Sequence, residues 1–225
     1  MKGINFPETV PITGRVRICL ELLEEQSVKG KVLVDIGSSF GWLEKAISGW
    51  GAKKIIGIEP DEKALLFAKK NAPEAEYIQG TASNIPLPGS SADIVIFYDV
   101  IEHVPREDEL KVLKEVWRVL KKGRVLLFST PNASLLSNIC DIAWYFGHRH
   151  YTEKQISKFM DEAGFRVKKI MKKGSLLSSL YLSWFYIAKR ILGISQPRNK
   201  FFEKIDDEGY KKEGITNIFL AAIKK

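Results

Sequence analysis

The sequence is poor in the residues that build disulfide frameworks and metal centres. Its 225 residues include two cysteines, Cys19 and Cys140, and three histidines. The cysteines are far apart and neither has a partner at metal-ligand spacing, which favours a reduced, intracellular setting. Residues 1–15 lack the apolar core of a signal peptide. A cytoplasmic protein is therefore expected.

Long apolar runs and blocks of one charge are also missing. The uncharged part of residues 174–194 is about 15 residues long, whereas a membrane span takes roughly 20, so no transmembrane helix is expected. The 35 Lys and Arg exceed the 27 Asp and Glu, but the two signs are mixed along the chain. This pattern indicates a solvated surface with a net charge of +8 and does not favour a nucleic-acid partner.

What the chain does contain is a regular alternation of strand-like and helix-like segments. Strands are expected at 31–37, 54–60, 74–80, 92–100, 124–130, 166–173 and 215–225, and helices at 13–26, 41–50, 61–71, 107–121 and 153–165. This order predicts a parallel sheet with helices on both faces, in which ligands bind at the carboxyl ends of the strands. The first helix could help to cover that site. A single domain over residues 1–225 is expected, with a helical insertion on the substrate side at about 174–214.

The turn after the first expected strand reads LVDIGSSFGW, residues 33–42. Gly37 and Gly41 let the backbone approach a ligand, and a helix that begins near Gly41 would point its N–H groups at the loop. A nicotinamide-binding loop requires G-x-G-x-x-G, but the second and third positions hold Ser39 and Trp42. A P-loop is excluded too, because no Gly-Lys-Ser/Thr follows.

Residues 35–41 resemble the D/E-x-G-x-G-x-G loop of class I S-adenosylmethionine-dependent methyltransferases. Further motifs follow in that family's order, namely IIGIEP (55–60), YIQGTASNIPLPGSSADIVIFYDVIEHV (77–104), LKEVWRVLKKG (113–123) and HYTEKQISKFMDEAGFRV (150–167). They are most similar to the branch that contains quinone and small-molecule methyltransferases. The resemblance covers about residues 28–171 and the last strand. It implies an α/β, Rossmann-like, doubly wound and mostly parallel seven-stranded sheet with an antiparallel last strand.

The same resemblance implies a site for the cofactor S-adenosyl-L-methionine. The residues at its cofactor-binding positions are Asp35, Gly37, Ser38, Gly41, Glu59, Pro60, Thr81, Ala82 and Tyr98. Glu59 is expected to pair with the two ribose hydroxyls, because a carboxylate accepts readily from two neighbouring donors. Tyr98 and Asp99 are expected near the methionine portion and the substrate. Each assignment has a plainer alternative: Asp35 as a helix cap, Glu59 as a strand-end charge, and Tyr98 with Asp99 as an unrelated polar strand end.

Three residues depart from the family pattern. Ser39 replaces the middle Gly of the loop, Thr81 replaces an acid that binds the adenine amino group, and Arg124 replaces a Gly before the fifth strand. Ser39 matters only if its position needs a positive φ or has no room for a side chain. Thr81 can still accept a hydrogen bond, and Arg124 is expected on the far side of the sheet from the site. Cofactor binding is therefore expected to be retained.

His103 and His150 are the candidate catalytic residues. A base is needed only if the methyl acceptor must lose a proton. His103 follows the fourth strand and could face the methyl group, while the resemblance implies that His150 lies near the site entrance. A structural role is the alternative for His103, and a capping contact with the helix that begins near Thr152 is the alternative for His150. No third ligand cluster accompanies His148 and His150, so no metal is expected.

Residues 174–194 form a two-sided helical pattern. One side carries Leu176, Leu177, Leu180, Tyr181, Trp184, Phe185, Ala188, Ile191 and Leu192, and the other carries Ser178, Ser179, Ser183, Tyr186, Lys189 and Arg190. The helix either caps the domain or contacts a membrane surface or a lipid-like acceptor. The sequence thus indicates a methyltransferase acting on a small-molecule or lipid-like acceptor. The alternative is a methyltransferase-like binding or partner subunit that has lost turnover, and neither the acceptor nor the oligomeric state can be read from the sequence.

Overall fold

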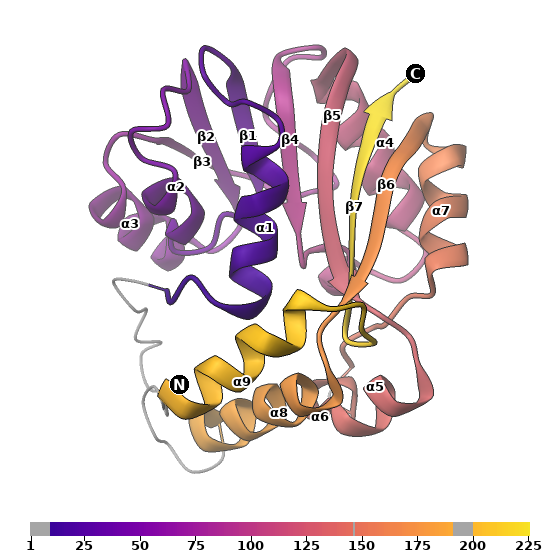
Figure 1. The fold of residues 1–225 in the computed structure, drawn as a ribbon. Helices are drawn as coiled ribbons and strands as arrows, with labels where there is room; N and C mark the ends of the chain where they lie inside the picture. The colour runs from indigo at the N-terminus through magenta and orange to yellow at the C-terminus, as the bar shows by residue number, and fades with distance from the viewer. Residues whose placement is uncertain (1–9, 146, 191–199) are drawn as a thin grey trace.

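A single twisted sheet forms the centre of the molecule (Figure 1). The computed structural model describes residues 10–145, 147–190 and 200–225. The strands are β1 (Val32–Ile36), β2 (Lys54–Glu59), β3 (Glu76–Gln79), β4 (Ala92–Tyr98), β5 (Leu120–Pro131), β6 (Phe165–Lys173) and β7 (Asn217–Lys224). Their order is β3-β2-β1-β4-β5-β7-β6, and β7 runs antiparallel to both of its neighbours. The predicted Rossmann-like sheet with an antiparallel last strand is confirmed.

Helices cover both faces of the sheet because its strands are apolar on both sides. On one face lie α1 (Gly14–Glu24), α2 (Trp42–Ala46) and α3 (Glu62–Asn71), and on the other lie α4 (Glu109–Val119) and α7 (Glu153–Glu162). Every residue of β4 is buried, as a central strand between two helical layers requires. Leu22 and Leu43 pack in the α1 and α2 layer, whereas Val116 and Met160 pack in the α4 and α7 layer.

The junction between α4 and β5 differs from the prediction. The helix was expected to reach residue 121 and the strand to begin at 124, but α4 ends at Val119 and β5 begins at Leu120. The carboxylate of Asp93 pairs with Lys121 at 3.0 Å and with Arg124 at 3.4 Å. These pairs hold the chain extended where helix propensity alone would have continued the helix.

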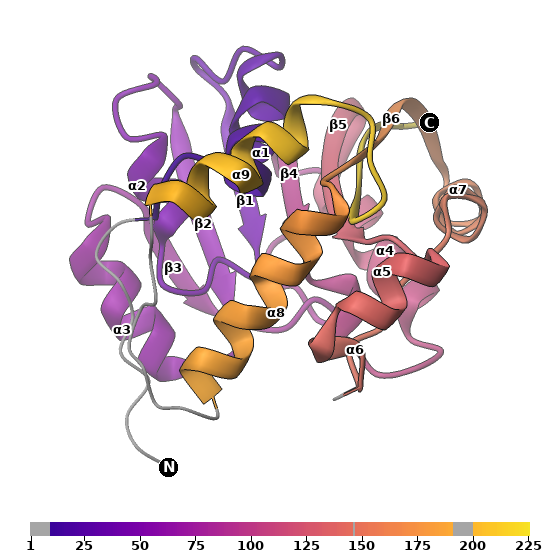
Figure 2. The same ribbon diagram turned by 60° about the horizontal axis from the view of Figure 1, so that its bottom comes forward.

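Four helices gather at the carboxyl edge of the sheet (Figures 1 and 2). They are α5 (Leu135–Cys140), α6 (Ile142–Tyr145), α8 (Leu176–Arg190) and α9 (Lys200–Lys211). The first two follow β5, α8 follows β6, and α9 leads into β7. Both α8 and α9 lie within the range expected for a helical insertion, about 174–214, whereas α5 and α6 were not expected. Together they form a cover over the strand ends where a ligand of this fold class binds.

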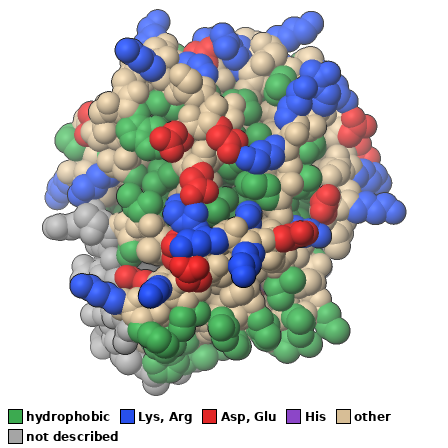
Figure 3. Space-filling model, in the orientation of Figure 1, with side chains coloured by type: hydrophobic (Ala, Val, Ile, Leu, Met, Phe, Trp, Pro, Cys, Tyr) green, Lys and Arg blue, Asp and Glu red, His purple; other side chains and the backbone are tan. Residues whose placement is uncertain are grey.

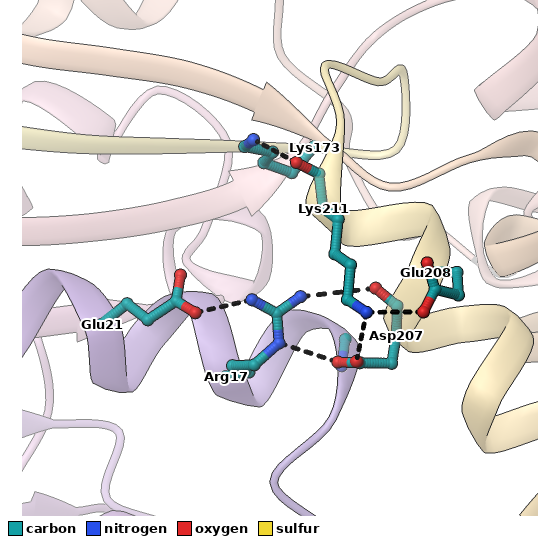
Figure 4. Close-up of polar contacts among 7 residues, drawn as sticks. Arg17, Glu21, Lys173, Asp207, Glu208 and Lys211 are labelled. Atoms are coloured by element: carbon teal, nitrogen blue, oxygen red, sulfur yellow. Dashed lines mark hydrogen bonds and ion pairs between the residues drawn. The ribbon is translucent and has the colours of Figure 1, made fainter.

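Ion pairs fasten α9 to α1 (Figure 4). Nε of Arg17 lies 2.8 Å from Oδ1 of Asp207, and the backbone N–H of Gly14 donates to the same oxygen at 2.9 Å. Glu21 holds the Arg17 guanidinium from the other side at 2.6 Å. The buried Tyr210 adds a hydrogen bond from its hydroxyl to Oδ1 of Asn217 at 2.7 Å. The C-terminal half of α9 is therefore tied to α1 and to β7.

The serine side of α8 faces the domain. Ser178 and Ser179 are buried, and the hydroxyls of Ser179 and Thr216 are 3.1 Å apart. The Ser183 hydroxyl donates to the carbonyl of Cys140 and accepts from the N–H of Ile142 at 2.9 Å.

The apolar side of α8 points largely to solvent. Leu176, Leu177, Leu180 and Trp184 are exposed, although Ala188 is buried. Ile191 and Leu192 lie outside the described residues, and the side chains of Phe185, Tyr186, Lys189 and Arg190 are not among those described. In the described ranges, no helix combines the length and apolarity needed to cross a bilayer.

Candidate functional site

The turn at residues 37–41 lies at the carboxyl end of β1, against the end of β2. The N–H groups of Gly37 and Ser38 both donate to the carbonyl of Ile58, at 2.8 and 3.1 Å. Gly37 has a φ of +82°, and a Cβ there would lie 2.5 Å from Cγ2 of Val100. Gly41 has a φ of +76°, and its Cβ would lie 2.6 Å from the Tyr77 hydroxyl oxygen. Both positions therefore require glycine, and the turn presents bare backbone.

Ser39 adopts a φ of +50°, so its position is one that favours glycine. Its N–H donates to Oε2 of Glu59 at 3.0 Å. The other oxygen of Glu59 accepts from the N–H of Asp61 at 3.1 Å. A carboxylate has about four acceptor sites, so two remain for hydroxyl donors. The structure thus places the Glu59 carboxylate directly beside the turn.

A group of buried polar atoms lies beneath the turn. Oγ of Ser38, both carboxyl oxygens of Glu44 and the Tyr77 hydroxyl have no hydrogen-bond partner in the described part of the chain. Burial, with the nearby charge of Glu59, raises the pKa of Asp35 to about 7. Burial and the neighbouring Asp35 raise the pKa of Glu44 well above its ordinary value. Asp35 does not cap a helix, because it lies within β1.

Pro60, Thr81 and Ala82 follow the ends of β2 and β3 at the same edge. The Gln79 side chain donates from Nε2 to the carbonyl of Pro60 at 3.1 Å, which links the two strand ends. The Thr81 hydroxyl lies 3.2 Å from that of Ser83, and its carbonyl accepts from the N–H of Asn84. Ala82 packs against the core. These residues form a short rigid wall next to Glu59.

Tyr98 and Asp99, at the carboxyl end of β4, both contact α1. The buried hydroxyl of Tyr98 donates to the carbonyl of Cys19 at 2.9 Å, so its polar atom fastens α1 to the sheet. Asp99 has a φ of +54° and accepts a hydrogen bond from the Ser129 hydroxyl at 3.0 Å. Its second oxygen lies 2.7 Å from Arg15, whose pKa it raises. Arg15 was not foreseen, because no local pattern on α1 distinguishes it from other surface arginines.

His103 and His148 face each other. His103 lies in the short helix η1 (Ile101–His103) after β4, and its ring centre is 4.5 Å from that of His148 in an edge-to-face arrangement. Partial desolvation lowers the pKa of both rings, although the His103 side chain is exposed and that of His148 is half-buried. They therefore favour the neutral form, which can accept a proton.

His150 is engaged on both ring nitrogens. Nδ1 lies 2.8 Å from Oδ1 of Asn138 and Nε2 lies 3.0 Å from Oδ2 of Asp141. The ring ties residue 150 to α5 and to the start of α6. The expected alternative, a capping contact with α7, is wrong: Thr152 and Gln155 form the capping box of that helix.

Arg149 holds the segment that carries His103. Its guanidinium pairs with Glu109 and donates to the carbonyls of Ile101, at 2.9 Å, and of Val104. This residue was missed, since it lies in a stretch without periodicity. No group of three or more His, Cys, Asp or Glu side chains suited to one metal ion occurs in the described ranges.

Comparison with known proteins agrees with this geometry. Residues 34–128 match the family model described as a methyltransferase domain. Over these residues the chain is therefore similar to methyltransferase domains. The chain is 31% identical over 118 residues to a protein of Mycolicibacterium smegmatis named as a probable S-adenosylmethionine-dependent methyltransferase. This match covers 52% of this chain and 45% of that protein. The chain thus spans less than half the length of that relative.

Two other comparisons extend over most of the chain. The ubiquinone/menaquinone biosynthesis C-methyltransferase of Campylobacter jejuni is 25% identical over 93% of this chain and 86% of its own length. An S-adenosylmethionine-dependent methyltransferase structure from Mesorhizobium loti has a TM-score of 0.65 and 17% identity, and covers 93% of this chain and 97% of that one. The second comparison concerns the fold alone.

The residues around the turn fit S-adenosylmethionine, the cofactor named for the Mycolicibacterium smegmatis protein. The two glycines exclude side chains from the turn, so that a ligand can approach its backbone closely. Glu59 adds a carboxylate with acceptor capacity for neighbouring hydroxyls. Ser39 is compatible with this arrangement, because its backbone N–H donates to Glu59 and so helps to position that carboxylate.

Proposed function

We propose that this protein transfers a methyl group from S-adenosylmethionine to a small-molecule or lipid-like acceptor. The observation that carries the proposal is the position of the Glu59 carboxylate beside the glycine turn, at the carboxyl end of β2. In this assignment Glu59 accepts from the ribose hydroxyls. The backbone of Gly37, Ser38 and Gly41 lies against the methionine portion, with Asp35 below it. Pro60, Thr81 and Ala82 border the adenine.

S-adenosylmethionine supplies a methyl group that is already activated by its positively charged sulfur. The protein's task is to align the acceptor and to keep water away. Tyr98 is buried and contributes an apolar ring wall, because its hydroxyl is bonded to α1. Arg15 offsets the charge of Asp99 at the end of β4. The four helices at the carboxyl edge shield the same region from solvent.

His103 is the base in this proposal. Its lowered pKa keeps the ring neutral near pH 7, so that it can take a proton from a hydroxyl acceptor. His148 and Arg149 position the ring and its segment. His150 would have to break one of two hydrogen bonds before it accepted a proton. We therefore assign His150 to holding α5 and α6 at the entrance.

The acceptor class is supported by similarity to the ubiquinone/menaquinone C-methyltransferase, which extends along most of both chains. The hydroxyl of a hydroxylated ring would supply the proton that His103 removes. An apolar tail on that ring would partition into lipid. We accordingly propose a quinone-like or similar lipid-like acceptor. The site geometry by itself is compatible with oxygen, nitrogen or carbon as the atom methylated.

Calorimetric titration tests the cofactor assignment. The protein should bind S-adenosylmethionine and S-adenosylhomocysteine and should not bind NADH. Glu59→Gln should weaken binding about tenfold to a hundredfold, because a hydrogen bond to a charged group contributes about 1.5–3 kcal/mol. Glu62→Gln, at an exposed position three residues further on, is the matched control. Equal affinity of the two variants would remove Glu59 from the site.

Turnover separates the enzyme from a binding subunit. Labelled methyl donor is incubated with lipid and small-molecule extracts, and incorporation is followed for the wild-type protein and His103→Gln. We expect loss of transfer with donor affinity unchanged. Donor binding without transfer to any fraction would instead favour the non-catalytic alternative.

A further inference from the structure

The helices at the carboxyl edge carry most of the exposed apolar side chains. Eleven of the thirteen large hydrophobic residues exposed in the described part of the chain lie on α5, α6, α8 and α9. They are Leu135, Leu136, Ile139, Trp144, Tyr145, Leu176, Leu177, Leu180, Trp184, Phe201 and Phe202. Figure 3 shows hydrophobic side chains gathered along the lower edge of the molecule, beneath α9. Scattered apolar residues are normal on a surface, but a contiguous set of this kind marks an interaction site. We call this set the apolar edge.

The orientation of α8 is set by hydrogen bonds and is not a result of loose packing. Ser179 bonds Thr216, and Ser183 bonds both Cys140 and Ile142. A rotation of α8 that turned its leucines toward the domain would expose these hydroxyls and leave their buried partners without hydrogen bonds. Each unpaired buried group would then destabilise the fold by its desolvation free energy. The fold therefore holds the apolar side of α8 outward.

The charge along this part of the chain indicates what covers the apolar edge. Residues 172–202, from the carboxyl end of β6 to the start of α9, contain six Lys and Arg and no Asp or Glu. α5, α6 and α8 also contain no acidic residue, and the acids of α9 come after Phe201 and Phe202, with Asp207 paired to Arg17 of α1. An anionic lipid surface attracts basic segments and accepts apolar side chains beneath them. A nucleic acid would match the charge but would not cover exposed leucines.

The aromatic residues at the apolar edge match the same partner. Trp144, Tyr145 and Trp184 are 42%, 62% and 45% exposed. Trp and Tyr concentrate at the boundary between headgroups and acyl chains, because one part of each ring is apolar and another is polar. Tyr181 and Phe202 stack at 5.6 Å and join α8 to α9 in one surface.

We infer that the apolar edge docks the protein on the surface of an anionic lipid bilayer, with α5, α6 and α8 lying in the interface. The docked helices follow directly from β5 and β6, so the bilayer lies next to the proposed methyl-transfer site. Where the proposed function also holds, the acceptor is reached from the membrane. The docking itself requires neither donor nor acceptor.

Vesicle flotation tests the docking with the full chain and no cofactor. The protein should bind phosphatidylcholine vesicles that contain phosphatidylglycerol, should bind pure phosphatidylcholine more weakly, and should be released in part by high salt. Leu177→Gln should lower binding about tenfold, since it removes about one leucine side chain from the lipid. Leu66→Gln is the matched control, because Leu66 on α3 is 54% exposed, similar to Leu177 at 58%. Trp emission should shift to the blue on binding, and less so in Trp184→Phe.

Several outcomes would overturn the inference. One is no binding to anionic vesicles at low salt by protein that binds S-adenosylhomocysteine. Another is equal binding of Leu177→Gln and Leu66→Gln, both confirmed as folded by circular dichroism. A third is a stable dimer in solution that Leu177→Gln dissociates, which would show that a second copy covers the edge. Because vesicle binding and donor binding are measured separately, failure of one leaves the other intact.

Discussion

Replacing Ser39 with glycine should stabilise the protein. Ser39 has a φ of +50°, a conformation that costs a non-glycine residue about 1–2 kcal/mol. Glycine avoids that cost but loses about 0.5–1 kcal/mol through its greater freedom in the unfolded chain. The N–H that donates to Glu59 is retained, and the Ser39 hydroxyl has no hydrogen bond to another described residue. The net gain is therefore about 0.5–1 kcal/mol.

Urea unfolding and calorimetry measure this effect. For a chain of this size the melting temperature should rise by roughly 2–4 °C per kcal/mol. Ser90→Gly is a matched comparison, because Ser90 has a φ of +54° in an exposed loop away from the turn. Ser39→Ala keeps the Cβ and should bring no gain.

Donor affinity in the same variants tests the role of the Ser39 side chain. If the hydroxyl makes no bond to the donor, Ser39→Gly should bind S-adenosylhomocysteine at least as tightly as the wild-type protein. A loss of stability in Ser39→Gly beside a gain in Ser90→Gly would refute the strain argument. A gain in stability with weaker donor binding would show instead that the hydroxyl contacts the ligand.

Three further predictions concern the buried groups around the site. The raised pKa values of Asp35, about 7, and of Glu44 mean that the folded protein keeps protons that the unfolded chain releases, so the free energy of unfolding should fall between about pH 4 and about pH 7, by up to roughly 1.4 kcal/mol per pH unit for one carboxyl. Urea unfolding at several pH values should show a smaller fall for Glu44→Gln than for the wild-type protein, and an equal fall in both would contradict this prediction. Gly41→Ala should lower the free energy of unfolding by about 1–3 kcal/mol more than Gly49→Ala, because both glycines have a positive φ but only a Cβ at Gly41 would meet the Tyr77 hydroxyl. Equal melting temperatures of the two variants would show that the turn can shift to make room. Arg149→Met should lower the free energy of unfolding, measured in urea, by about 2–4 kcal/mol, because it removes the ion-pair partner of Glu109 and the donor to two backbone carbonyls. Arg106→Met, at an exposed position, should have no effect, and an equally small effect of both variants would show that Arg149 does not hold the segment.

The sheet was predictable because its signals are local. Strands such as β1 and β4 are short apolar runs that end at turn residues, and their order follows from the alternation with helices. The limits of α4 and β5 were less predictable, since Asp93 reaches across from β4 to set them. Helices α5 and α6 were not foreseen, because at six and four residues they are too short to show a helical period. The position of α9 depends on contacts with α1, nearly 200 residues away in the chain.

The glycine turn and the acid beside it were predictable from the sequence, whereas the residues that hold the neighbouring segments were not. Gly37, Gly41 and Glu59 carry the family pattern, and the structure brings them together at the edge of the sheet. Arg15 and Arg149 bind carboxylates and carbonyls that are distant in the sequence, so no local sequence pattern predicts their roles. For His150, the sequence could suggest a place near the entrance but not that both ring nitrogens are engaged.

The strained backbone at this edge argues that the site is formed before any ligand arrives. Ser39 and Asp99 are non-glycine residues with positive φ, and they follow β1 and β4, which are neighbours in the sheet. Each is held by interactions outside its own turn: Ser39 by Glu59, and Asp99 by Ser129 and Arg15. Such conformations persist only where the surroundings over-determine them, and they concentrate at ligand sites. The proposed donor site should therefore be pre-organised at Ser39 and Asp99 before the donor binds.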